Sequence, residues 1–162
     1  MTQFYYGVKD TDHLIALTRK VVATFGGGRK ALFIMLGTCA TETHFAQFPD
    51  RHPEKLGVGV GQCDKIALRD VKLHIRPHDR TTLAKLGYDI DTVKLADLAD
   101  DPLLALCIMR LVYKRKTEPF PSSDDIRGQG EYWKQHYNTY AGAGSAQKYV
   151  EDFTLYVPSE FQ

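Results

Sequence analysis

The stretch that decides the fold is apolar all the way round and reads Ala31-Leu32-Phe33-Ile34-Met35-Leu36. A helix without a polar face belongs inside a core, because every side of it would expose apolar groups to water. The helical pattern runs from about Lys30 to His44 and follows a glycine triplet, residues 26–28, which stops the preceding helix. This triplet lacks the GxxxxGK[ST] pattern of a phosphate loop. The sequence therefore predicts one buried central helix around which the rest of the chain must wrap.

Two further long helices are predicted, one before and one after the central helix in the sequence. Upstream, Asp12 is a candidate N-cap for a helix whose apolar residues recur at helical spacing between Leu14 and Phe25. Downstream, Asp101-Pro102 combine a capping residue with a proline at the first helical position. The helix that follows, Leu103 to Val112, is apolar on nearly every face, and Lys114-Arg115-Lys116 end it where cations suit the helix dipole.

The remaining segments predict short helices and one irregular region. Asp64 and Ser145 are candidate N-caps, and residues 123–137 are expected to be helical in spite of two glycines. Residues 71–75 alternate between apolar and polar side chains, so they fit a strand as well as a helix. Residues 48–62 contain two prolines and three alternate glycines, which favours a loop or a small hairpin near Gly57 to Gly61. We expect a mainly α, α-rich (α+β) single domain, residues 1–162, with about six to eight helices.

The composition is typical of a soluble globular domain. The 162 residues carry 21 Lys and Arg against 20 Asp and Glu, and 43% are apolar, which excludes disorder and broad electrostatic capture of nucleic acid. Three cysteines, Cys39, Cys63 and Cys107, are too few and too widely spaced for a disulfide framework, and together with His44 and His52 they show no standard zinc-ligand spacing. No secretory signal or membrane span is visible, so we expect synthesis in the cytosol.

Glu42 is the main candidate for chemistry. It ends the predicted central helix, within Gly37-Thr-Cys-Ala-Thr-Glu-Thr-His-Phe45, and it has small or apolar neighbours with no Lys or Arg close in the sequence. The negative end of the helix dipole and the loss of solvation both disfavour the ionised form, so the pKa of Glu42 is expected to be raised. A carboxyl that stays protonated near neutral pH can act as a general acid. The alternative is a side chain that simply reaches solvent beyond the helix end.

Two other segments are candidates for ligand binding. The glycines of Gly57-Val-Gly-Val-Gly61 would let the backbone approach a ligand closely, and Gln62 adds an amide donor and acceptor. Tyr113, at the end of the second apolar helix, can hydrogen-bond a substrate. The structural alternatives are a plain glycine turn and an ordinary half-buried tyrosine. The run from Glu131 to Asn138 mixes aromatic and polar groups, so it fits stacking on sugars or bases as well as a packed aromatic helix.

In their order and spacing, these segments resemble the lytic transglycosylase and goose-type lysozyme superfamily. The resemblance covers about Ala31 to Phe153 and rests on Thr41-Glu42-Thr-His-Phe45, a turn ending in Gly61-Gln62, and a later helix ending in Tyr113. The tail from Tyr132 to Thr139 is similar to that of small phage and prophage members. Each motif is short, so the weight of the resemblance lies in their arrangement along the chain.

The resemblance implies a lysozyme-like fold and cleavage of the β-1,4 bond between N-acetylmuramic acid and N-acetylglucosamine in peptidoglycan. It implies Glu42 as general acid and base, with Gly61, Gln62 and Tyr113 in substrate-binding roles. It implies neither a metal nor an organic cofactor. Because no secretory signal is visible, we expect such an enzyme to act on the bacterial wall after phage delivery or release, as a virion or tail-associated protein or as an endolysin-like one. The expected partners are peptidoglycan strands and other phage virion proteins, with no nucleic acid or membrane insertion.

The chain departs from the family pattern at three places. Thr43 stands where serine is usual, Leu56-Gly57-Val58 replace a Ser-Gly step, and Lys114 stands where asparagine is usual. Most glycosidases use two carboxylates. No second acid is obviously placed here, which favours a one-carboxylate mechanism, although three residues are candidates: Asp50, Asp64 and Asp70.

Two other classes of protein remain as alternatives. One is a phage structural or assembly module that keeps the fold without catalysis, which the departures around the turn and Tyr113 favour. The other is a helical nucleic-acid-binding protein that uses Lys114-Arg115-Lys116, which the near-zero net charge disfavours.

Overall fold

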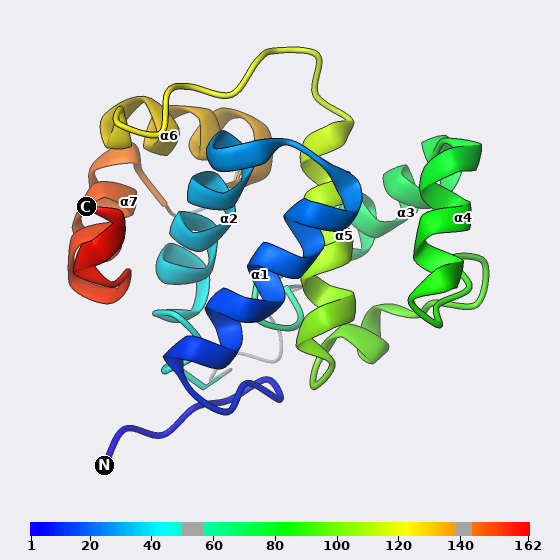
Figure 1. Cartoon of the computed structure of the whole chain (residues 1–162), viewed down its shortest axis with the longest axis horizontal. Coiled ribbons are helices and arrows are strands. Elements are labelled where there is room, and N and C mark those ends of the chain that lie inside the picture. Colours follow the sequence, from blue (N-terminus) through cyan, green and yellow to red (C-terminus); the bar gives the residue numbers. More distant parts are fainter. Residues whose placement is uncertain (50–56, 139–143) are drawn as a thin grey trace.

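Helix α2, Gly28–Thr43, lies in the middle of the molecule and packs against both α1, Thr11–Phe25, and α7, Ala146–Tyr156 (Figure 1). In this computed structural model, which describes residues 1–49, 57–138 and 144–162, twelve of the sixteen α2 residues are buried. Every side chain from Ala31 to Leu36 is among them. The predicted central helix is thereby confirmed, and it starts two residues earlier than expected because Gly28 belongs to its first turn.

The other helices lie on two sides of this centre (Figure 1). On one side α6, Ile126–Trp133, packs against α7, and on the other α5, Pro102–Lys114, packs against α1. Beyond α5 lie α3, Lys65–His74, which contacts it, and α4, Pro77–Lys85. Short 3-10 turns, η1 and η3, cover Leu95–Leu98 and Ser159–Phe161, and a π turn, η2, follows α6 over Lys134–Asn138. Seven α-helices in the described ranges confirm the predicted helical domain.

The small hairpin expected near Gly57 to Gly61 is reduced to a single antiparallel bridge. Val58 and Cys63 exchange two backbone hydrogen bonds, of 2.9 and 3.1 Å, and no strand extends from them within the described residues. Residues 71–74, which also fitted a strand, are helical. In α3 only Leu68 and Val71 are buried, which is helical spacing, and the apolar Leu73 is left exposed on another face.

Capping side chains explain where most helices begin. Asp64, Asp101 and Ser145 each accept a hydrogen bond from a first-turn N–H of α3, α5 or α7, as predicted. Helix α1 is a correction, because Asp10 is its N-cap and accepts from the third helical N–H at 2.7 Å. Asp10 has the extended backbone that a cap requires, with φ of −165°, whereas Asp12 is already inside the first turn. Helix α6 begins at Ile126, three residues later than the predicted start at 123, and Asp125 is its N-cap and accepts from the N–H of Gly128.

Gly37 lets another helix approach the central helix closely. The hydroxyl and ring of Tyr149, on α7, occupy the space where a Cβ at residue 37 would lie. Tyr149 is fully buried, and its hydroxyl lies 3.3 Å from Oε1 of Gln129 on α6, to which it donates. The missing side chain of Gly37 therefore lets α7 lie directly against the backbone of α2.

Candidate active site

Glu42 lies one residue before the C-terminal end of α2, and its side chain is partly buried. Its Oε1 accepts a hydrogen bond from Nε1 of Trp133 at 3.1 Å. Trp133 ends α6, is 1% exposed and packs against Tyr149 with ring centres 5.8 Å apart. The carboxyl is therefore held by a donor that core packing fixes in place.

The environment of Glu42 favours its protonated form. Burial raises the pKa of the carboxyl to about 7. The Trp133 hydrogen bond and the charge of Lys148 oppose this rise, and the carboxylates of Asp152 and Asp64 add to it. The direction agrees with the sequence-based expectation, and burial is the main cause. A carboxyl with this pKa can give up a proton and take one back close to neutral pH.

An ion pair from α7 is anchored on the end of α2, beside Glu42. Lys148 Nζ lies 2.6 Å from Asp152 Oδ2 and donates to the backbone carbonyl of Thr41 at 2.8 Å. The hydroxyl of Thr41 donates to the same Asp152 oxygen at 3.1 Å. Asp152 is buried, so the pairing with Lys148 satisfies a carboxylate that burial would otherwise penalise.

The chain reverses sharply after Glu42 through three left-handed residues. His44, Phe45 and Ala46 have φ of 50°, 60° and 66°, a region that costs a residue other than glycine about 1–2 kcal/mol. Backbone N–H groups of Phe45 and Ala46 bond to the carbonyl of Cys39 at 3.0 Å and to the hydroxyl of Thr43 at 3.2 Å. These bonds fix the turn that follows the candidate acid in the sequence.

Thr43 also joins the glycine turn to the end of α2. Its hydroxyl donates to the carbonyl of Val60 at 2.8 Å, so this hydroxyl ties the two segments together. Gln62 has a left-handed φ of 49°, and its amide donates to the carbonyl of Gly59 at 3.0 Å. The side chain predicted to bind a ligand therefore closes its own turn in this structure.

Tyr137 connects the glycine turn to Tyr113. Its hydroxyl donates to the carbonyl of Gly61 at 2.6 Å, and its ring stacks on that of Tyr113 with centres 5.1 Å apart. The hydroxyl of Tyr113 lies 2.7 Å from Oγ1 of Thr38, one turn before Glu42 on α2, and Tyr113 is 1% exposed. Burial raises the pKa of both tyrosine hydroxyls, and the charge of Glu42 adds to the rise.

The network of the candidate site thus has two sets of contacts that meet on α2. One joins Glu42 to Trp133, and the other runs from Thr38 through Tyr113 and Tyr137 to Gly61. The amide of Gln62, the fourth predicted site residue, bonds to its own turn. The sequence singled out Trp133 and Tyr137 only as members of an aromatic run, without a role beside Glu42, and Lys148 and Asp152 were missed. One signal was available, since a buried tryptophan N–H needs an acceptor and a carboxyl near an apolar helix end is one. The aromatic residues of the run 131–138 pack against the core, with Tyr132 and Trp133 buried and Tyr137 partly buried.

The other candidate acids differ in their surroundings. Asp70 lies 2.9 Å from Nε of Arg115 and 3.1 Å from Nδ1 of His74, so it belongs to a separate set of ion pairs. Asp64 caps α3 and also contributes to the charge around Glu42. Asp50 lies outside the described residues, as do His52 and Thr139.

Metal-ligating side chains do not gather in the parts of the chain that the structure describes, where no group of three or more His, Cys, Asp or Glu is arranged to hold an ion. All three cysteines are free and buried, as expected for small apolar side chains. Among the described helices, none combines the length and the hydropathy needed to cross a bilayer.

Comparisons with protein-family models, with curated proteins and with solved structures found no match to this chain. The residues and their geometry therefore carry the functional argument.

Proposed function

We propose that this protein is a peptidoglycan-degrading glycosidase that cleaves the β-1,4 bond between N-acetylmuramic acid and N-acetylglucosamine, as a lytic transglycosylase or a muramidase. The observation that carries the proposal is the carboxyl of Glu42, which ends the central helix, accepts a hydrogen bond from Trp133 and has a pKa raised to about 7. Its site of action is the bacterial wall, reached after phage delivery or release, with wall glycan and other virion proteins as partners.

In this mechanism Glu42 acts first as an acid and then as a base. It donates its proton to the glycosidic oxygen as the bond from that oxygen to C1 breaks, and the acetamido oxygen of the substrate stabilises the positive charge at C1. The carboxylate then takes a proton from the muramyl C6 hydroxyl, whose oxygen bonds to C1 and gives a 1,6-anhydro product. When it takes the proton from water instead, the product has a reducing end.

A path with one catalytic carboxylate suits the surroundings of Glu42. The neighbouring carboxylate, Asp152, is engaged by Lys148 and by the Thr41 hydroxyl, so it is not free to attack the sugar. In the proposal the buried Gly61 and Tyr113 support the site, joined by Tyr137. Gln62 is partly exposed, and it contacts the glycan after releasing its hydrogen bond to the carbonyl of Gly59.

The test is cleavage of purified peptidoglycan by the full chain at several pH values, followed by mass spectrometry of the soluble products. Anhydro-muramyl ends would identify a lytic transglycosylase, and reducing ends would identify a muramidase. The absence of soluble products at every pH, with protein shown to be folded by circular dichroism, would contradict the proposal.

A non-catalytic phage structural or assembly module is the second candidate, and the state of Tyr113 favours it. Its ring is 1% exposed and its hydroxyl is engaged by Thr38, so this side chain reaches no ligand without a rearrangement. Calorimetric binding of a chitooligosaccharide with no turnover of peptidoglycan would support this candidate over the glycosidase.

Replacing Trp133 by phenylalanine is expected to move the alkaline limb of the pH–activity profile to higher pH, by up to about one unit. The indole N–H stabilises ionised Glu42 and lowers its pKa, so without it burial acts with less opposition. In the variant Glu42 then stays protonated at a pH above about 7, where Glu42 of the wild type is ionised. Initial rates of glycan cleavage measured against pH provide the check.

The matched control is Tyr132→Phe, on the same helix. It removes a hydroxyl that donates to the carbonyl of Glu118 at 2.9 Å and has no bond to Glu42, so the limb should stay in place. A limb that stays in place in Trp133→Phe would show that the indole does not act on the catalytic acid, and a limb that moves to lower pH would contradict the direction of its effect.

A further inference from the structure

Positive charge is concentrated in one part of this nearly neutral chain. Residues 65–85, which span α3 and α4, carry six Lys and Arg against two Asp. The end of α5, which packs against α3, adds Lys114, Arg115 and Lys116. Because the whole chain has a net charge of only +1, the remainder of the molecule is net negative.

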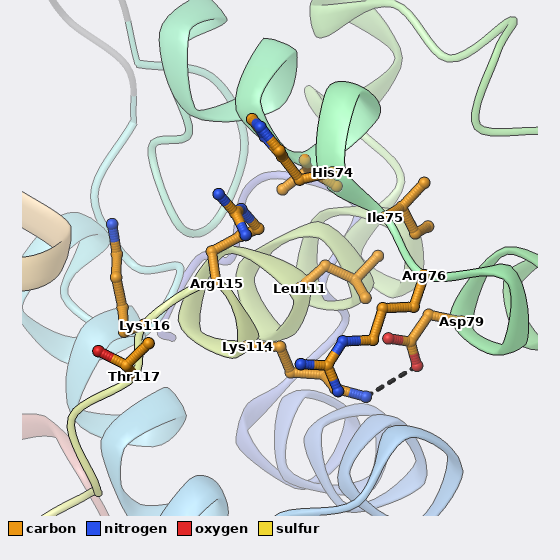
Figure 2. Close-up of a pocket in the computed structure, with 10 residues that line it drawn as sticks. His74, Ile75, Arg76, Asp79, Leu111, Lys114, Arg115, Lys116 and Thr117 are labelled. Carbon is orange, nitrogen blue, oxygen red and sulfur yellow. Dashed lines mark hydrogen bonds and ion pairs between the residues drawn. The ribbon is translucent and has the colours of Figure 1, made fainter.

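These helix ends enclose a groove of about 380 Å³ (Figure 2). The volume lies within the range of roughly 300–1,000 Å³ that is usual for sites that bind small ligands. Three apolar side chains contribute to the lining, and most of the others are basic: His74, Arg76, Lys114, Arg115 and Lys116.

Ion pairs neutralise only part of this charge. Lys114 Nζ lies 2.8 Å from Oδ1 of the buried Asp79, the pair marked in Figure 2, and Arg115 is paired with Asp70 at 2.9 Å. Within the described residues, no carboxylate forms an ion pair with Arg76 or Lys116. Figure 2 shows Arg76 extending from the start of α4 across the groove toward the end of α5.

Helix dipoles explain some of these cations but not all. Helix α5 ends at the groove, so Lys114 and Lys116 offset the partial negative charge of its terminal carbonyls. Arg76 lies on a different element, at the N-cap of α4, where the helix dipole is already positive and no side chain caps the first turn. A cation at that position is unfavourable for the helix itself, so the helix dipole does not account for it.

We propose that this groove binds the phosphate group of a small phosphorylated ligand. The planar donor fork of Arg76 and the ammonium group of Lys116 suit the several oxygens and the multiple charge of a phosphate. Val71, Ile75 and Leu111, the apolar part of the lining, suit the organic part of such a ligand. The inference does not rest on the proposed glycosidase activity, because none of the groove residues belongs to the network around Glu42.

The experiment is a calorimetric titration of the full chain with sodium pyrophosphate at constant ionic strength, with sodium chloride of equal ionic strength as the reference. We expect saturable binding with one site. The double substitution Arg76→Gln, Lys116→Gln is expected to weaken it at least about tenfold. The control double substitution Lys9→Gln, Lys30→Gln removes the same charge from exposed positions outside the groove and should bind as the wild type does.

Other outcomes would overturn the proposal. Equal weakening in both double variants would show that pyrophosphate responds to net charge and not to the groove. No saturable binding by a folded wild type would exclude the site. Salt-dependent binding of a DNA duplex that pyrophosphate does not displace would assign the charge to a nucleic-acid surface instead.

Discussion

Glu42→Gln is expected to lower the rate of peptidoglycan cleavage by about 10²–10⁴-fold, the contribution typical of a general acid or base. Glutamine has nearly the same shape, and its amide oxygen can still accept the hydrogen bond from Trp133, so the fold around position 42 should persist. The amide cannot release a proton to the glycosidic oxygen or take one back. Rates on purified peptidoglycan, with mass spectrometry of the products, measure the loss.

The same variant has an independent readout in its stability. The pKa of Glu42 is about 7 in the folded protein and about 4.3 in an unfolded chain. The unfolded state therefore ionises first as pH rises, and the wild type loses stability between these two values. The glutamine variant does not titrate, so its stability relative to the wild type should rise with pH over this window and then level off. Urea unfolding at a series of pH values would show this.

Asp70→Asn is the matched control for the substitution at Glu42. It removes a carboxylate of the Arg115 ion pair, which lies outside the network of Glu42, so cleavage should be preserved. Equal activity of wild type and Glu42→Gln would mean that another carboxylate carries the reaction. A flat pH dependence of the stability difference would mean that Glu42 is not buried as described.

Gly37→Ala is expected to destabilise the protein by about 1–3 kcal/mol, in spite of alanine's better helix propensity. The new methyl group would occupy the space of the Tyr149 hydroxyl, and Tyr149 is fully buried, so the ring has little room to withdraw. The strain falls on the contact of α7 with α2. Helix α7 also supplies Lys148 and Asp152 to the site. Urea unfolding at one pH measures the free energy of unfolding.

A double-mutant cycle separates this steric clash from a general effect of the substitution. Tyr149→Phe removes the oxygen nearest to the added methyl group and the bond to Gln129. In the double variant, the loss of stability should be smaller than the sum of the two single losses. Additive losses would show that Gly37 does not act through Tyr149.

The helices were largely predictable because their signals are local. The all-round apolar stretch of α2 and the pair Asp101-Pro102 before α5 each lie within one segment, and each predicted its element correctly. The predicted N-cap of α1, Asp12, was wrong because Asp10 and Asp12 are equally good capping side chains. The choice between them depends on which backbone is extended, and composition does not reveal that.

Of the candidate site, only the features that depend on neighbours in the sequence were predictable. Glu42 stood out through its helix end and its neighbours in sequence, and the raised pKa follows from that position. Trp133 lies 91 residues away and Lys148 is 107 residues from Thr41, so no spacing pattern links them. The Gln62 amide bonds to the carbonyl of Gly59, and the backbone of Gln62 is left-handed. The identity of the residue does not indicate either feature.

The left-handed turn at residues 44–46 changes how natural variation near Glu42 should be interpreted. Positive φ excludes β-branched side chains at these three positions whatever the protein does, and Thr43 is constrained by its bonds to Val60 and Ala46. Low divergence at 43–46 among relatives would therefore record backbone geometry and carry no information about catalysis. In a set of diverged sequences, only invariance of position 42 itself would be evidence of selection for chemistry.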